Sequence, residues 1–181
     1  MPRSGTSLMM HMLDAGGVPA LSDGRRPADL HNPHGYFEDE RTRRLAQDSS
    51  WIEEARGKAI KIIYRLLPHL PPRLEYDILF MERDLHEIYD SQKTMLEAKS
   101  DPSAGQDRDR MVHALGRDLD MVREWLAKQA SIRCISVPYA KMVREPERWA
   151  VQVAQFLGRD LDVGAMAAVV DPALYRHRIA R

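Results

Sequence analysis

The chain has 181 residues, and its 27 lysines and arginines are balanced by 27 aspartates and glutamates, so the formal net charge is zero. This length suits one domain, residues 1–181. The neutral charge excludes broad nucleic-acid binding. No apolar run approaches the roughly 20 residues that are needed to cross a bilayer. Cys134 is the only cysteine, which excludes an internal disulfide, and without a clear signal peptide we expect a cytoplasmic protein.

The first third of the chain predicts two helices and a strand around a long loop. Residues 7–15 read as a short helix that Gly16 and Gly17 end, and residues 18–40 read as a loop, since they are rich in Gly, Pro, Asp and Asn. Residues 41–57 have helical composition, and residues 59–64 form an apolar strand candidate.

The remaining chain alternates strands with helices. Strands are predicted at 76–81 and 132–137, and helices at 85–98, 107–129, 146–157 and 161–170. Apolar strands that alternate with helices indicate a parallel sheet covered on both faces. The sequence therefore predicts an α/β fold in three layers.

The first informative motif is Pro2-Arg3-Ser4-Gly5-Thr6-Ser7, directly before a predicted helix. Glycine allows a tight turn, and the amide N–H groups at a helix N-terminus attract an anion. Thr6 and Ser7 add hydroxyl donors, and Arg3 adds a planar cation. The alternative is an ordinary N-cap beside a surface charge. It is not a Walker A loop, because Thr6 stands where the lysine would be.

This motif resembles the 5′-phosphosulfate loop of the sulfotransferases that use 3′-phosphoadenosine 5′-phosphosulfate (PAPS). Arg83 at the end of a predicted strand and Ser91 in the following helix resemble the pair that grips the 3′-phosphate in that family. Alone, Arg83 would read as a surface partner of Glu82 or Asp84, and Ser91 as part of a solvated helix face.

A looser resemblance covers most of the remaining chain. Tyr139 lies in a segment, Val137–Pro146, that resembles the family's strand–Tyr–helix unit, and Arg176 and Arg178 lie in one that resembles the basic closing segment of bacterial members. The resemblance implies a P-loop NTPase-like sulfotransferase fold and cofactor contacts from Arg3, Ser4, Gly5, Thr6, Ser7, Arg83, Ser91, Tyr139, Arg176 and Arg178. It also implies a small-molecule hydroxyl or amine acceptor, 3′,5′-bisphosphoadenosine as product, and no metal.

The general base is the main departure from the animal cytosolic members of that family. Their base is a His after the second strand, whereas Lys61 is followed here by two isoleucines. We favour Glu38 as the base, with Glu40 and His34 as further candidates, and expect Arg3 and Lys61 to act on the sulfonate. The alternatives are a solvated acidic run for Glu38 and a snorkelling side chain for Lys61.

The loop motif also raises an expectation about the N-terminus. In the family, such a loop follows a central apolar strand, whereas here it begins at the first residues. We therefore expect that the 181-residue form lacks this strand and is less stable and less active than a form extended upstream.

Two other functions stay open at the level of sequence. A P-loop nucleotide kinase or NTPase would use Glu82 at the end of an apolar strand as its Walker B acid. A degenerate nucleotide-binding protein would keep the fold without turnover.

Cys134 alternates with apolar residues and is expected to be an inert, buried thiol.

Overall fold

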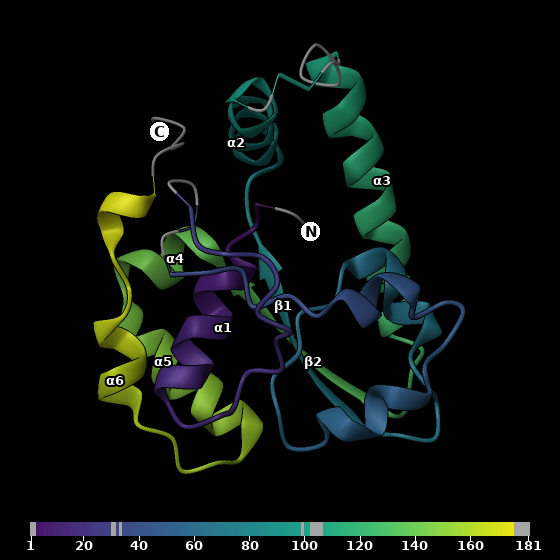
Figure 1. Ribbon diagram of the computed structural model, residues 1–181, viewed down its shortest axis with the longest axis vertical. Coiled ribbons are helices and arrows are strands. Elements are labelled where there is room, and N and C mark those ends of the chain that lie inside the picture. Colours follow the sequence, from purple (N-terminus) through teal and green to yellow (C-terminus); the bar gives the residue numbers. More distant parts are fainter. Residues whose placement is uncertain (1–2, 30–31, 33, 99, 102–106, 176–181) are drawn as a thin grey trace.

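The computed structural model describes residues 3–29, 32, 34–98, 100–101 and 107–175, and all structural statements refer to these. Figure 1 shows α2 and α3 rising beyond the sheet, with α1 and α4–α6 gathered on one side of it. The elements in chain order are α1 (Thr6–Ala15), η1 (Glu40–Arg44), η2 (Ser50–Ala55), η3 (Tyr64–His69), β1 (Tyr76–Glu82), α2 (Leu85–Ala98), α3 (Arg108–Leu126), β2 (Ile132–Pro138), α4 (Tyr139–Arg144), α5 (Pro146–Leu157), α6 (Val163–Ala168) and η5 (Pro172–Leu174).

Strands β1 and β2 pair in parallel, from Tyr76 opposite Ile132 to Glu82 opposite Pro138. Successive side chains of a strand point to opposite faces. Leu79 and Met81 accordingly pack in a cluster with α1, α4, α5 and α6, whereas Phe80 packs in a second cluster with α3 and the 3-10 segments. The α/β class with a parallel sheet is confirmed, and the three-layer arrangement of the P-loop type stays a prediction.

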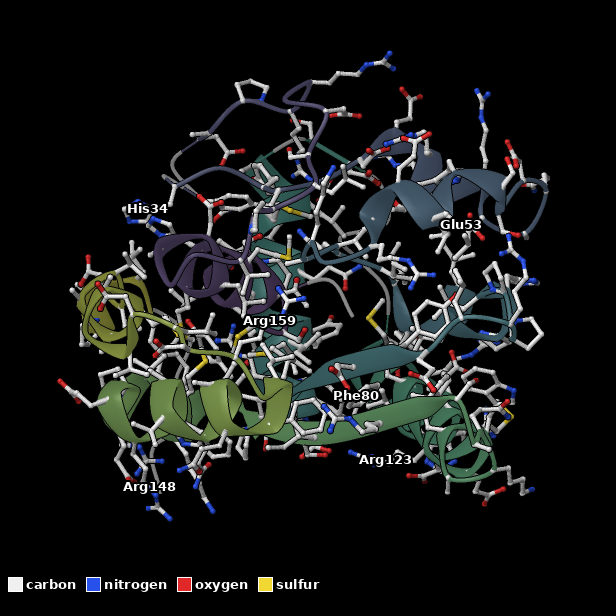
Figure 2. The ribbon with its side chains drawn as sticks, turned by 90° about the horizontal axis from the view of Figure 1, so that it is seen from below. His34, Glu53, Phe80, Arg123, Arg148 and Arg159 are labelled. Carbon is white, nitrogen blue, oxygen red and sulfur yellow. The ribbon has the colours of Figure 1, made fainter. Side chains whose placement is uncertain are left out.

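The helix boundaries follow local chemistry. The Asp107 carboxylate caps α3 by accepting from the backbone N–H of Arg110. Pro146 occupies the first turn of α5, and Gly158 ends that helix in the left-handed conformation at φ 62°. Figure 2 shows Arg148 on the outer side of α5, as expected for an amphipathic helix whose other face is buried.

The helix predicted at 41–57 is wrong, since the segment forms the separate 3-10 helices η1 and η2. The Asp48 carboxylate accepts hydrogen bonds from the backbone N–H and the hydroxyl of Ser50. Such local side-chain bonds compete with a continuous helix.

The strand predicted at 59–64 is also wrong. Ala59 forms one isolated parallel bridge with Ala20, and the chain enters η3 at Tyr64. Residues 57–62 do not pair with the sheet, which in the described residues consists of β1 and β2. Instead, these residues and Tyr76–Leu79 of β1 line the same cavity, of about 990 Å³. The strand expected upstream of Arg3 stays a prediction.

Cys134 is exposed, so its prediction as a buried thiol is wrong. Its partner in register is Ile78, on the face that α3 and the 3-10 segments cover. That cover reaches Ile132 at the start of β2 but leaves Cys134 and Ser136 exposed.

Within the described ranges, no helix has both the length and the apolar character of a membrane span.

Candidate active site

A cavity of about 880 Å³ brings together residues from the loop before α1, Glu38, Lys61 and the pair Arg83 and Ser91. The cavity lies where the N-terminal loop meets the carboxyl end of β1, which is the usual ligand position in parallel sheets. Its lining includes Arg3, Gly5, Thr6, Ser7, Glu38, Lys61, Arg83, Ser91 and Tyr139.

The loop before α1 turns on Gly5, whose φ is 94°. A Cβ at this position would lie 2.2 Å from Cδ2 of Tyr139, so the ring excludes any side chain here. Arg3 also has a positive φ, 65°, which a residue with a side chain adopts only when its surroundings hold it there.

Arg3 joins this loop to Arg83 and Ser91. Its Nε donates a hydrogen bond to the Ser91 hydroxyl over 2.9 Å, and its carbonyl oxygen accepts from Nη1 of Arg83 over 3.0 Å. Burial lowers the pKa of Arg3, against the opposing effect of Tyr36. The two motifs, 80 or more residues apart in sequence, therefore form one cluster.

Arg83 is buried, with 7% of its side chain exposed. Its Nε donates over 3.0 Å to Glu87, one helical turn further on, rather than to Glu82 or Asp84. Its guanidinium carbon lies 4.9 Å from the ring centre of Tyr139 and 5.1 Å from that of Tyr175. Ser91 is 1% exposed, so it does not lie on a solvated helix face.

Lys61 extends into the other end of the cluster. Its Nζ donates to the Ser7 hydroxyl over 3.2 Å, to the Tyr36 carbonyl over 3.0 Å and to Glu38 over 3.2 Å. Burial lowers the pKa of Lys61, although Glu38 partly offsets this. The ammonium thus lies beside the first turn of α1.

Glu38 forms ion pairs with three cations: Lys61, Arg26 at 3.1 Å and Arg43 at 3.7 Å. Burial alone would raise its pKa, but Lys61 and Arg26 outweigh burial and hold it below the ordinary value of 4.5. The carboxylate is therefore ionised at neutral pH, in the form that can accept a proton. The alternative of a fully solvated acidic run does not fit this geometry.

Comparison with protein families matched residues 57–163, more than half of the chain, to the sulfotransferase family. The chain belongs to the sulfotransferase family. The matched part contains Lys61, Arg83, Ser91 and Tyr139, whereas the loop at 3–7 and Glu38 lie outside it. Comparisons with curated proteins and with solved structures found no significant match.

Two expected cofactor contacts of this sulfotransferase lie behind the loop. Ser4 is fully buried, and the Tyr139 ring packs against Gly5 and meets the Tyr175 ring edge-on, with 5.0 Å between centres. Both therefore support the loop, and Tyr139 also lines the cavity, whereas Ser4 does not. Arg176 and Arg178 lie outside the described residues.

The other two candidates for the base are placed differently. Glu40 lines the cavity but forms an exposed ion pair with Arg25. His34 stacks on His11 of α1, with 4.8 Å between ring centres. Neither contacts Lys61 in the described part of the chain, so Glu38 has the best position.

Sequence reasoning missed three residues of this sulfotransferase site: Arg26, Glu87 and Tyr175. The Arg26 guanidinium lies 3.3 Å from the ring centre of Tyr36 and contacts Glu38. Glu87 could have been found, because residues at i and i+4 are neighbours on a helix and Arg83 precedes α2 by two residues. No local pattern marks Tyr175, which reaches Glu87 across 88 positions.

The acid of the kinase alternative lies elsewhere. Glu82 accepts from Arg123 over 3.0 Å and from Ser136 over 3.1 Å, and it does not line the cavity. Within the described ranges, no three His, Cys, Asp or Glu side chains are grouped as metal ligands would be.

Proposed function

We propose that this sulfotransferase moves a sulfuryl group from PAPS to a hydroxyl or amine of a small-molecule acceptor. One observation carries the proposal: a single cavity gathers three cations, Arg3, Lys61 and Arg83, around the loop before α1. The cavity volume, about 880 Å³, lies within the roughly 300–1,000 Å³ of small-molecule sites.

The hydrogen-bond donors that line the cavity fit a ligand with two separate anionic groups. At one end Lys61 lies beside the Ser7 hydroxyl, and at the other Arg83 lies near Ser91, with Arg3 between them. Guanidinium, ammonium and hydroxyl donors suit phosphate and sulfonate oxygens. The loop end would hold the 5′-phosphosulfate, and the Arg83 end would hold the 3′-phosphate.

PAPS, when bound, supplies the sulfuryl group: an acceptor oxygen or nitrogen forms a bond to sulfur as the bond from sulfur to the bridging oxygen breaks. By analogy with phosphoryl transfer, the protein contributes mainly positioning and charge stabilisation. Lys61, Arg3 and the amides of the loop would stabilise negative charge on the leaving bisphosphate. The burial of Arg3 and Lys61 strengthens this effect, because charges interact more strongly away from water.

Glu38 would accept the proton that the acceptor loses. Its carboxylate is ionised, lines the cavity and lies 3.2 Å from Lys61 Nζ. A positioned general base typically contributes about 10²–10⁴-fold to rate. This contact supports the proposal, because it would keep the base close to the ammonium that is proposed to act on the sulfonate.

Calorimetry with 3′,5′-bisphosphoadenosine and with Mg-ATP tests the proposal. We expect the bisphosphate to bind, Arg83→Ala to weaken it at least tenfold, and Mg-ATP to bind more weakly. A matched control is Arg65→Ala, which removes an arginine that pairs with Asp118 outside the cavity. Binding of Mg-ATP without binding of the bisphosphate would overturn the proposal and favour the kinase.

A further inference from the structure

A buried polar group, the carboxylate of Glu87 and the hydroxyl of Tyr175, lies beside the Arg83 guanidinium. The Tyr175 hydroxyl lies 2.8 and 2.7 Å from the two Glu87 carboxylate oxygens, and Arg83 Nε lies 3.0 Å from one of them. Glu87 and Tyr175 are 6% and 9% exposed. A carboxylate, a phenol and a guanidinium thus meet in a space that solvent hardly reaches.

These contacts fix the direction of the Arg83 guanidinium. Glu87 holds Nε, and the rings of Tyr139 and Tyr175 lie 4.9 and 5.1 Å from the guanidinium carbon. The planar group then directs Nη1 to the carbonyl of Arg3 over 3.0 Å. Because Arg3 has a positive φ, this bond stabilises a loop conformation that the residue would not adopt by itself.

The hydroxyl of Tyr175 is a donor in this arrangement. Burial, reinforced by Glu87, raises the pKa of Tyr175 to about 12. The phenol therefore keeps its proton at neutral pH and donates a hydrogen bond to the carboxylate, so Glu87 accepts hydrogen bonds from both Tyr175 and Arg83. Removing the hydroxyl would leave a buried carboxylate with one fewer donor, which favours a shift of Glu87 and of the arginine bound to it.

We propose that Glu87 and Tyr175 are positioning residues that orient Arg83 toward the 3′-phosphate and, through the Arg3 carbonyl, hold the phosphate loop. The inference rests on the proposed use of PAPS. It also links the end of the described chain to the loop at its beginning, since Tyr175 directly follows η5.

The test measures selectivity for the 3′-phosphate rather than affinity alone. Dissociation constants are measured for 3′,5′-bisphosphoadenosine and for adenosine 5′-phosphate, which lacks the 3′-phosphate. The selectivity ratio, Kd for adenosine 5′-phosphate divided by Kd for the bisphosphate, is compared among variants. A variant that is only partly folded loses apparent affinity for both ligands equally, so the ratio isolates the orientation of Arg83. Tyr175→Phe keeps the ring and its packing, and Glu87→Gln keeps the shape of the side chain.

We expect Tyr175→Phe to lower the ratio by about 3- to 10-fold and Glu87→Gln by at least as much, since a hydrogen bond to a charged group contributes the equivalent of roughly tenfold or more. The matched control is Tyr64→Phe, which removes another buried phenol that donates to a carboxylate, Asp118, outside the cavity. Its ratio should equal that of the wild type.

Three results would count against these ideas, and they are distinguishable. An unchanged ratio in both Tyr175→Phe and Glu87→Gln would overturn the positioning role. A higher ratio in Glu87→Gln would overturn it too, because the carboxylate would then act only by opposing the anion. A wild-type protein that does not prefer the bisphosphate at all would overturn the proposed cofactor instead.

Discussion

Replacing Glu38 by glutamine removes the proposed base while keeping the size of its side chain. The structure gives this carboxylate a direct partner in Lys61 and further ion pairs with Arg26 and Arg43. Glutamine can still accept a hydrogen bond from Lys61, but it cannot take a proton from the acceptor. The variant therefore separates proton transfer from packing.

The expected loss in kcat is about 10²–10⁴-fold, the usual contribution of a general base. The expected loss of stability is small, about 1.5 kcal/mol at most, because Glu38 is 28% exposed and such bonds are worth roughly 1.5–3 kcal/mol when buried. Lys61 keeps the Ser7 hydroxyl and the Tyr36 carbonyl as partners, so no buried charge is left without a hydrogen bond.

The assay follows release of 3′,5′-bisphosphoadenosine at saturating PAPS with a mixture of hydroxyl and amine acceptors. Affinity for the bisphosphate should not fall, because Glu38 carries the same charge sign as the ligand. The matched control is Glu40→Gln, two residues away, which breaks an exposed pair with Arg25 and should retain the wild-type rate. A Glu38→Gln rate within threefold of wild type, or an equal loss in Glu40→Gln, would refute the reasoning.

Three further predictions concern the loop, the buried arginine and pH. Gly5→Ala should lower bisphosphate affinity at least tenfold, as measured by calorimetry, because its Cβ would lie 2.2 Å from the Tyr139 ring. The control is Gly17→Ala, where a Cβ meets nothing within 4 Å. Arg83→Lys should fold, as melting curves would show, yet weaken binding about tenfold, since lysine cannot present two N–H groups in one plane. Because folding lowers the pKa of Glu38, ionised Glu38 stabilises the fold at pH values above its ordinary pKa of 4.5. This contribution is lost as the pH falls through the pKa of the folded state. The difference in Tm between wild type and Glu38→Gln should therefore vanish in acid.

The sequence predicted the parts of the fold that local patterns determine. Strands at 76–81 and 132–137 and the helix at 146–157 carry their own signals, such as alternating apolar residues or Pro146 and Gly158 at the helix ends. The residues at 59–64 carry the same apolar signal, yet only Ala59 pairs, because no described strand lies beside them. Strand formation depends on a neighbour that the segment itself does not encode.

In the candidate site, the sequence likewise predicted some residues but not the contacts between them. Arg83 and Ser91 were singled out by their resemblance to a motif of the family, and both line the cavity beside the loop. Their direct partners were not predicted: Ser91 accepts from Arg3, and Arg83 donates to Glu87. Such pairings depend on how α2 packs against the loop, which no short motif records.

The central claim, sulfuryl transfer, is tested most directly by following the sulfuryl group. The purified chain is incubated with PAPS labelled in its sulfonate and with a mixture of hydroxyl and amine acceptors, beside the variant Lys61→Met. We predict label in an acceptor with stoichiometric release of 3′,5′-bisphosphoadenosine, and at least a tenfold lower rate in the variant, because Lys61 lies between Ser7 and Glu38. Tight binding of the bisphosphate without transfer to any acceptor would contradict the account and indicate a binding protein of this family.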